Sequence, residues 1–196
     1  MIKHQTFKDY ETYTKVQGGK AIYMREKLIG AIPSASRAFS RIFNQAKPYM
    51  NHGTILCLGA RSGAEVLGAG VAGFVHPVGI DLHPVGDNVL KADWHDMPFL
   101  NKSFANVFTN SLDHCFDFDK LINEIKRVLV DNGVFFFYAP DKQGFEDLEE
   151  RMSHGGNEAM YWQKSTDIVH RLNEAGFNLI HSWKNGKNSF YIMKKM

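Results

Sequence analysis

The spacing of apolar side chains changes near residue 50 and divides the chain into two parts. Before this point, apolar residues recur at the three- and four-residue spacing of a helix. They are Phe39, Ile42, Phe43 and Ala46, and Pro48 closes the segment. From residue 54 onward, short apolar runs alternate with amphipathic stretches. We therefore predict a helical N-terminal extension or lid over residues 1–50 and an α/β domain over residues 51–196.

The apolar runs of the second part have the length of β-strands. They cover residues 54–58, 78–82, 88–91, 105–110, 134–138, 178–183 and 188–193. The periodicity between them predicts helices over residues 63–72, 120–130 and 166–175. The link 184–187 is too short for parallel neighbours, so the last two strands are predicted to form an antiparallel hairpin. The fold class is therefore predicted to be α/β, with a doubly wound, mostly parallel sheet that ends in this hairpin.

Two local signals mark predicted helix ends. Ser62, followed three positions later by Glu65, is typical of a capping box at the start of helix 63–72. The pair Asn132-Gly133 is predicted to end helix 120–130. The continuously apolar run 134–138 that follows is typical of a central strand covered on both faces.

The composition indicates an ordinary globular chain of one domain. Of 196 residues, 44% are hydrophobic and 22% are charged, and the net charge of +2 does not favour nucleic acid as a partner. Cys57 and Cys115 form no CxxC pair and the nine histidines have no metal-ligand spacing, so we predict no metal. No charged-then-apolar leader and no apolar run of about 18 residues occurs, so we expect no membrane partner and a cytoplasmic location.

A glycine-bearing turn follows the first predicted strand, and an acid follows the second. Gly59 and Gly63 flank the turn, and Asp81 lies 22 and 18 residues after them. Such glycines let the backbone approach a ligand, and an acid about 20 residues further on typically accepts hydrogen bonds from ribose hydroxyls. The pattern predicts a nucleotide-type cofactor at the carboxyl edge of the sheet.

Several segments follow one another in a characteristic order. They are Ile55-Leu56-Cys57-Leu58-Gly59-Ala60-Arg61-Ser62-Gly63, the strand end at Asp81, Ala92-Asp93-Trp94, Ser111-Leu112-Asp113-His114, and the run 121–129 with Asp131-Asn132-Gly133. Together they resemble the class I S-adenosylmethionine-dependent methyltransferases, especially those acting on small molecules. The resemblance covers residues 53–140 and, by architecture only, residues 164–196. It implies the Rossmann-like methyltransferase fold.

The resemblance also implies S-adenosylmethionine as cofactor and methyl transfer to an oxygen or nitrogen of a small or medium-sized acceptor. It assigns to the cofactor Gly59, Ala60, Arg61, Gly63, Asp81, Leu82, Asp93, Trp94 and Ser111. Within this set it implies that Asp81 contacts the ribose and Asp93 the adenine amino group. His114 and Asp113 follow the fourth strand, where an acceptor meets the cofactor, and they are competing candidates for a catalytic general base.

Two residues depart from the family pattern. Cys57 stands where the family usually has an acid near the cofactor's amino group, and Arg61 stands where it usually has the middle glycine. Arg61 either forms a charge-assisted hydrogen bond with the cofactor carboxylate or fills the pocket. One alternative is therefore a non-catalytic protein with a degraded cofactor site, acting as a binding or regulatory partner. A second is a nicotinamide-dependent oxidoreductase, against which the turn lacks the G-x-G-x-x-G pattern.

Further residues near the predicted site allow two interpretations. Trp94 either stacks on adenine or anchors the core, and Asp96 lies close enough to Asp93 to compete for its role. Residues 141–163 form a polar insertion, which is either a lid over the site, together with the helix carrying Phe39, or a surface loop. The insertion holds His154, Gly155, Gly156, Met160, Tyr161 and Trp162.

Overall fold

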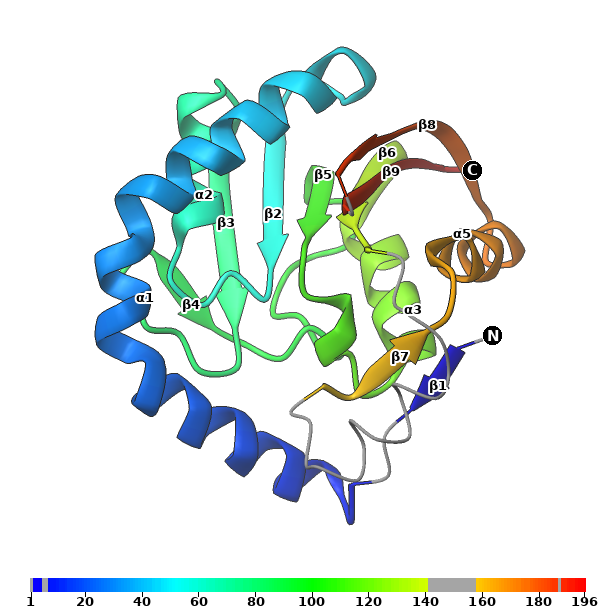
Figure 1. The fold of residues 1–196 in the computed structure, drawn as a ribbon. Coiled ribbons are helices and arrows are strands. Elements are labelled where there is room, and N and C mark those ends of the chain that lie inside the picture. Colours follow the sequence, from blue (N-terminus) through cyan, green and yellow to red (C-terminus); the bar gives the residue numbers. More distant parts are fainter. Residues whose placement is uncertain (1, 5–6, 141–157, 187) are drawn as a thin grey trace.

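A seven-stranded sheet forms the centre of the protein (Figure 1). The computed structural model describes residues 2–4, 7–140, 158–186 and 188–196. The sheet consists of β2 (Thr54–Leu58), β3 (Val75–Asp81), β4 (Val89–Lys91), β5 (Phe104–Thr109), β6 (Leu129–Tyr138), β8 (Phe177–Asn185) and β9 (Asn188–Lys195), in the order β4-β3-β2-β5-β6-β9-β8. Strands β2 to β6 are parallel, and β9 is antiparallel to both β6 and β8. The predicted mostly parallel sheet with a C-terminal hairpin is confirmed.

The strand order reverses between β2 and β5. From β2 the chain moves outward through β3 to β4 and then returns to β5 on the other side of β2. In open α/β sheets, ligands bind outside the carboxyl ends of the strands at such a switch point. The carboxyl ends of β2 and β5 are the paired residues Leu58 and Thr109. The residues that follow these two are therefore placed to form a site.

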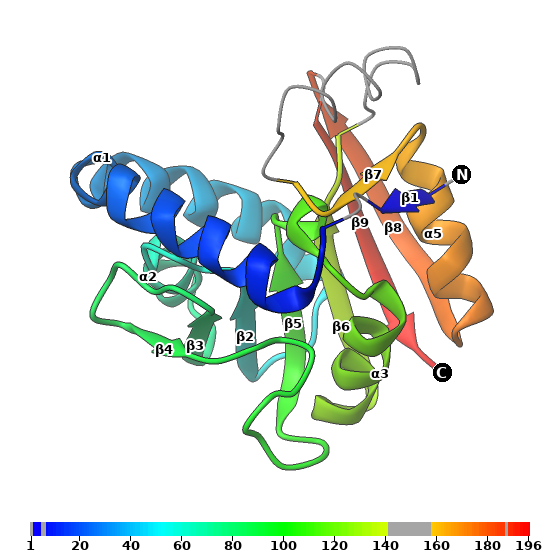
Figure 2. The same cartoon turned by 90° about the horizontal axis from the view of Figure 1, so that it is seen from below.

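Helices cover both faces of the sheet, as Figure 2 shows. They are α1 (Tyr10–Ala46), α2 (Ala64–Val71), α3 (Phe118–Val128) and α5 (Ser165–Glu174), with short 3-10 helices at Lys47–Tyr49 and Leu112–His114. Helices α1 and α2 pack on one face, and α3 and α5 pack on the other. Within β2, Ile55 and Cys57 face α1 and α2, whereas Leu56 and Leu58 face α3. Both sets are apolar because the strand is buried on both sides.

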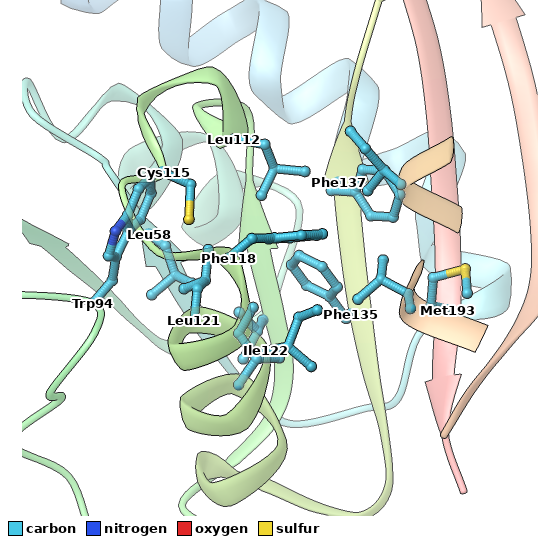
Figure 3. Close-up of a cluster of buried hydrophobic side chains, with 14 of the residues drawn as sticks. Leu58, Trp94, Leu112, Cys115, Phe118, Leu121, Ile122, Phe135, Phe137 and Met193 are labelled. Atoms are coloured by element: carbon cyan, nitrogen blue, oxygen red, sulfur yellow. The ribbon is translucent and has the colours of Figure 1, made fainter. Parts of the chain in front are cut away.

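An amphipathic helix packs the second face of the core. Leu121 and Ile122 are buried on the inner side of α3 and lie toward Phe135 of β6 (Figure 3). The carboxylate of Asp117 caps the helix by accepting the backbone N–H of Lys120 at 3.0 Å. Complete burial of one such apolar side chain contributes about 1.5–3 kcal/mol, so these contacts hold α3 firmly against the sheet.

Helix α1 is a single helix of 37 residues and extends well beyond the segment in which the sequence showed helical spacing, from Phe39 to Ala46. Its C-terminal half belongs to the core, because Phe43 is buried and its ring centroid lies 4.8 Å from that of Phe108. Its N-terminal half continues past this face toward the carboxyl ends of the strands (Figure 1). Phe39 and Phe43 therefore pack on the sheet instead of covering the site.

Both local helix-end predictions are wrong. The N-cap of α2 is Gly63 in a left-handed conformation, without a side-chain cap, and Glu65 is buried instead of forming a capping box with Ser62. Helix α3 ends at Val128, and β6 begins at the next residue. Asn132, with a φ of 60°, lies inside β6 at an irregularity in its pairing with β5. Hydrogen bonding to the neighbouring strand extends β6 through a pair that in isolation favours a turn.

A second sheet pairs β1 (Ile2–His4) with β7 (Met160–Trp162) in antiparallel fashion. All three residues of β7 are buried, and Nε1 of Trp162 donates to the Pro140 carbonyl at 2.8 Å. This end of the predicted insertion 141–163 is therefore a buried strand. The other residues named in the insertion, His154, Gly155 and Gly156, lie outside the described residues.

Candidate functional site

A cavity of about 150 Å³ lies at the carboxyl ends of the strands, beside the switch point between β2 and β5. The predicted site residues that line it are Gly59, Arg61, Asp81, Leu82, Trp94, Ser111 and His114. Ile80 and Ala92 complete the wall on the strand side, and Tyr13 and Gln17 of α1 close it from the other side. The predicted residues Ala60, Gly63, Asp93 and Asp113 do not contribute to the lining.

The turn between β2 and α2 depends on two glycines. Gly59 and Gly63 have φ angles of 68° and 77°, which side chains with a Cβ rarely adopt. A Cβ on Gly59 would lie 3.0 Å from the Ser111 Cβ and 3.2 Å from the Trp94 ring, whereas one on Gly63 would lie 1.9 Å from Oδ1 of Asn88. Gly59 therefore keeps open the space between Ser111 and Trp94, and Gly63 serves the packing of the turn.

Asp81 ends β3 and lines the cavity as a buried carboxylate, 6% exposed. Its Oδ1 accepts the backbone N–H of His83 at 2.8 Å, and its Oδ2 accepts the backbone N–H of Arg61 at 3.2 Å. The Arg61 guanidinium also approaches Oδ2, with Nε at 3.7 Å, and its Nη2 donates to Oε1 of Gln17 at 3.3 Å. Arg61 therefore lies in the cavity between Asp81 and α1. A carboxylate accepts about four hydrogen bonds, so Asp81 keeps capacity for a ligand.

Asp93 is held by other residues of the protein and lies outside the cavity lining. Its Oδ2 accepts the Tyr10 hydroxyl at 2.7 Å, and its Oδ1 accepts the backbone N–H of His95 and lies 2.8 Å from that ring's Nδ1. Burial would raise the pKa of Asp93, but the hydrogen bonds from His95 and Tyr10 outweigh this effect and keep the pKa below its usual value. Asp93 thus ties α1 to the segment after β4, and its contact with adenine stays a prediction.

His114 lines the cavity at the end of the short helix Leu112–His114. Burial lowers the pKa of its imidazole, and the neighbouring Asp113 carboxylate partly opposes this shift. The imidazole is therefore neutral near pH 7 and able to accept a proton. The backbone carbonyl of His114 accepts a hydrogen bond from the Tyr13 hydroxyl, which joins this turn to α1. Of the two candidate bases, His114 lines the cavity and Asp113 does not, and the role of either as a base stays a prediction.

Trp94 is a core anchor, which is one of the two interpretations that the sequence left open, and its stacking on adenine stays a prediction. It is 7% exposed and belongs to the core on the α3 face, and it also lines the cavity. Its ring stands edge-on to His95, with the ring centroids 6.1 Å apart. Trp94 is therefore a core anchor that also faces the cavity.

Sequence reasoning missed Tyr13 and Gln17, which are 2% and 1% exposed. The available signal was the aromatic pair Tyr10 and Tyr13, separated by the three-residue spacing of a helix. Gly18-Gly19 immediately after them weakens the helical pattern, because glycine is a poor helix former. Packing against the turns after β3 and β5 makes this half of α1 helical and buries its inner side.

Residues 56–137 match the family model for a methyltransferase domain. The matched region begins in β2 and ends in β6, so it includes the glycine turn, Asp81 and His114. This match covers less than half of the chain and agrees with the resemblance to the class I S-adenosylmethionine-dependent methyltransferases that the sequence carries. Among curated proteins, no sequence matches this chain.

Solved structures resemble the fold of this chain at low sequence identity. The PH0226 protein of Pyrococcus horikoshii OT3 is 17% identical with a TM-score of 0.61, and the alignment covers 80% of this chain and 90% of that one. A SAM-dependent methyltransferase of Archaeoglobus fulgidus is 12% identical with a TM-score of 0.62, at 82% and 94% coverage. The [4+2]-cyclase SpnF is 14% identical with a TM-score of 0.63, at 80% coverage of both chains. At these identities the likeness concerns the fold alone.

The polar groups of the cavity fit S-adenosylmethionine, the cofactor that the resemblance implies, but the volume of the cavity does not. Asp81 offers buried acceptor atoms for hydroxyls, and the Nε of Arg61 has no hydrogen-bond partner among the described residues. Gly59 leaves a space that a Cβ would fill. Small-molecule sites usually measure about 300–1,000 Å³, so a cavity of about 150 Å³ must widen to hold the whole cofactor. Tyr13, Gln17 and Arg61 are the side chains that narrow it.

Three further findings concern the rest of the described chain. None of its helices is both long and apolar enough to cross a membrane. Within the same residues, no group of three or more His, Cys, Asp or Glu side chains is arranged to hold a metal ion. Cys57 and Cys115 are buried free thiols.

Proposed function

We propose that this protein transfers a methyl group from S-adenosylmethionine to an oxygen or nitrogen of a small or medium-sized acceptor. The observation that carries the proposal is the meeting of Gly59, Asp81 and His114 in one cavity at three strand ends. All three lie within the segment that matches the methyltransferase domain. The acceptor is taken to be a small molecule because the cavity is narrow and enclosed by α1.

In this proposal the residues of the chain bind and orient the reactants. S-adenosylmethionine, when bound, supplies a methyl group that its sulfonium already activates, so alignment provides most of the rate. Asp81 accepts hydrogen bonds from the ribose hydroxyls at the end of β3. The Arg61 guanidinium, which now leans toward Asp81, pairs with the cofactor carboxylate through a charge-assisted hydrogen bond.

His114 provides the general base where the acceptor must lose a proton. Its burial keeps the imidazole neutral, and it lines the same cavity as Asp81. Tyr13 and Gln17 cover this region from α1 and exclude water from it, which strengthens electrostatic interactions inside.

A second function is a non-catalytic binding or regulatory role with a degraded cofactor site. The observation that favours it is the position of Arg61, whose side chain lies in the cavity and approaches Asp81 at 3.7 Å. In this case the Arg61 side chain always occupies part of the cavity, which stays too small for a nucleotide cofactor.

Calorimetric titration with S-adenosylmethionine and S-adenosylhomocysteine distinguishes the two functions. We expect micromolar binding by the wild type and at least about tenfold weaker binding by Asp81→Ala, because hydrogen bonds to a charged group are lost. Asp131→Ala, which removes a carboxylate that is 69% exposed, is the matched control and binds as the wild type does. Wild-type protein that binds neither compound, together with gain of binding in Cys57→Asp/Arg61→Gly, would establish the degraded site.

A further inference from the structure

Glu65 is a buried carboxyl that the proposed chemistry does not use. It is the second residue of α2, and it is 8% exposed. Within the described part of the chain, its Oε2 has no hydrogen-bond partner. Burial raises the pKa of Glu65 to about 7, an effect partly offset by its own backbone N–H and the Asn110 side chain. A buried polar atom without a partner is costly, and in native proteins each such atom has a specific explanation, of which a partner absent from the structure is one.

Glu65 lies at the switch point, directly behind the cavity wall. Its side chain interacts with Cys57, near the end of β2, and with Asn110, the residue that follows β5. Oδ1 of Asn110 accepts the Ser111 hydroxyl at 3.2 Å, and Ser111 lines the cavity. The Glu65 carboxyl is thus connected through Asn110 to a residue of the cavity lining, at the edge where open α/β sheets bind their ligands.

The surroundings of Glu65 favour a cation as the missing partner. Burial is the largest cause of the raised pKa values of Glu65 and of the Cys57 thiol. The charge of Asp81 on β3 raises the pKa of Glu65 further, and the charge of Glu65 raises that of Cys57 on β2. Asn110 contributes a neutral amide from the turn after β5. A positively charged N–H donor placed here satisfies the free oxygen and offsets the repulsion between Glu65 and Asp81.

We propose that Glu65 binds the α-ammonium group of the cofactor's methionine arm and thereby selects ligands that carry this arm. The inference rests on the proposed function. Cys57 occupies the strand position where the family usually has an acid, and Glu65 brings a carboxyl beside that position from α2. In this proposal, Glu65 on the helix supplies the carboxyl that Cys57 on the strand lacks, so a negative charge is kept at this place.

The test compares S-adenosylhomocysteine with 5′-methylthioadenosine, which has the same nucleoside but lacks the amino-acid arm. Titration calorimetry at pH 8, where Glu65 is ionised, gives both dissociation constants. In Glu65→Gln, the preference for S-adenosylhomocysteine falls by at least about tenfold, because a charge-assisted hydrogen bond is lost, while the affinity for 5′-methylthioadenosine is unchanged. Glu26→Gln, which alters an exposed carboxyl on α1, keeps the wild-type preference.

A second variant returns the carboxyl to the strand. Cys57→Asp combined with Glu65→Leu keeps one acid at this place and restores the preference that Glu65→Gln loses. For the case in which the variants do not fold, the wild type alone provides a readout. Its preference for S-adenosylhomocysteine falls between pH 8 and pH 5.5, because protonation removes the charge of Glu65.

The outcomes separate the two proposals. Wild-type binding with the same preference in Glu65→Gln, or with a preference that does not change with pH, overturns this inference and leaves the proposed function standing. Binding of neither compound by the wild type overturns the proposed function and this inference with it. Loss of preference in Glu65→Gln and its return in the swapped variant supports both.

Discussion

The carboxyl groups around the cavity differ in role because they differ in surroundings. Asp81 faces the cavity and keeps acceptor capacity, whereas Asp93 is engaged by Tyr10 and His95. Glu65 is buried behind the wall with one oxygen unpartnered among the described residues. Burial, hydrogen bonds and neighbouring charges set the protonation of each group separately. At this scale, depth and partners determine chemistry more than residue type does.

His114→Gln is expected to lower the turnover number by about 10²–10⁴-fold, the usual contribution of a positioned general base. The KM for S-adenosylmethionine stays close to the wild-type value, because the base acts on the acceptor. Burial keeps the pKa of His114 below 6.5, so the wild-type rate falls only as the pH drops below that value. The measurement is turnover between pH 5 and pH 9 with an accepted substrate. Asp113→Asn is the comparison, and a larger loss in that variant would assign the base to Asp113.

Helix α1 combines two tasks that the sequence pattern separates. Its C-terminal half covers one face of the sheet through Phe43, and its N-terminal half covers the cavity through Tyr13 and Gln17. The carbonyl of Thr14 also accepts a hydrogen bond from the His83 ring at 2.9 Å. Gly18-Gly19 lies directly after these contacts, where glycine lowers the stability of the helix.

Alanine is expected to stabilise the protein at Gly19 but not at the adjacent Gly18. A Cβ on Gly19 meets nothing within 4 Å, so Gly19→Ala raises stability by about 0.5–1 kcal/mol through its better helix propensity, and the Tm by about 1–4 °C. A Cβ on Gly18 lies 3.0 Å from the His83 ring and displaces it from Thr14, which cancels this gain. Thermal unfolding followed by circular dichroism measures both. Equal Tm increases would show that His83 yields without cost.

For the molecule as a whole, the buried ionisable groups at the cavity also affect the stability of the folded protein. The cavity lies between the sheet and α1, and the groups that form it belong to elements far apart in the sequence. Arg61, Asp81 and Glu65 surround one turn with little exposure to water. Ionisation of such a group in the folded protein therefore affects the free energy of unfolding of the entire chain.

The free energy of unfolding is expected to fall as pH rises through the range set by Glu65. Its pKa is raised from 4.5 to about 7, so between these values the folded protein binds more protons than the unfolded chain. The contribution of Glu65 to the free energy of unfolding is therefore greatest below pH 4.5. About 3 kcal/mol of this free energy is lost once the pH reaches 7, because one pKa unit corresponds to about 1.4 kcal/mol. The lowered pKa of His114 acts in the opposite direction.

Comparison with Glu65→Gln isolates this contribution, because His114 is present in both proteins. Urea unfolding between pH 5 and pH 8 should show the wild type losing stability relative to the variant as the pH rises. A constant difference between the two proteins would mean that Glu65 is ionised throughout, and that its burial is compensated by a partner.

The sequence predicted the part of the site that depends on local pattern. A strand followed by a glycine turn requires only the residues from Thr54 to Gly63, and the acid that ends β3 follows from the same βα repeat. The local pattern could not show that Trp94 lines the cavity and Asp93 does not, because strand pairing and loop hydrogen bonds decide which of two neighbours faces a cavity. Tyr13 was missed because it reaches the site from a helix about 100 residues before the turn that it contacts, at His114.

By itself, the sequence determined the fold class, the carboxyl-edge location of the site and the turn that shapes it. These properties rest on the periodicity of apolar residues and on backbone conformations that only glycine adopts readily, both of which are local. The tertiary structure decided the size of the cavity, the position of Arg61 against Asp81 and the burial of Glu65 beside Cys57. These depend on which distant elements pack together, because burial and neighbouring charge set both the free space and the protonation of each group.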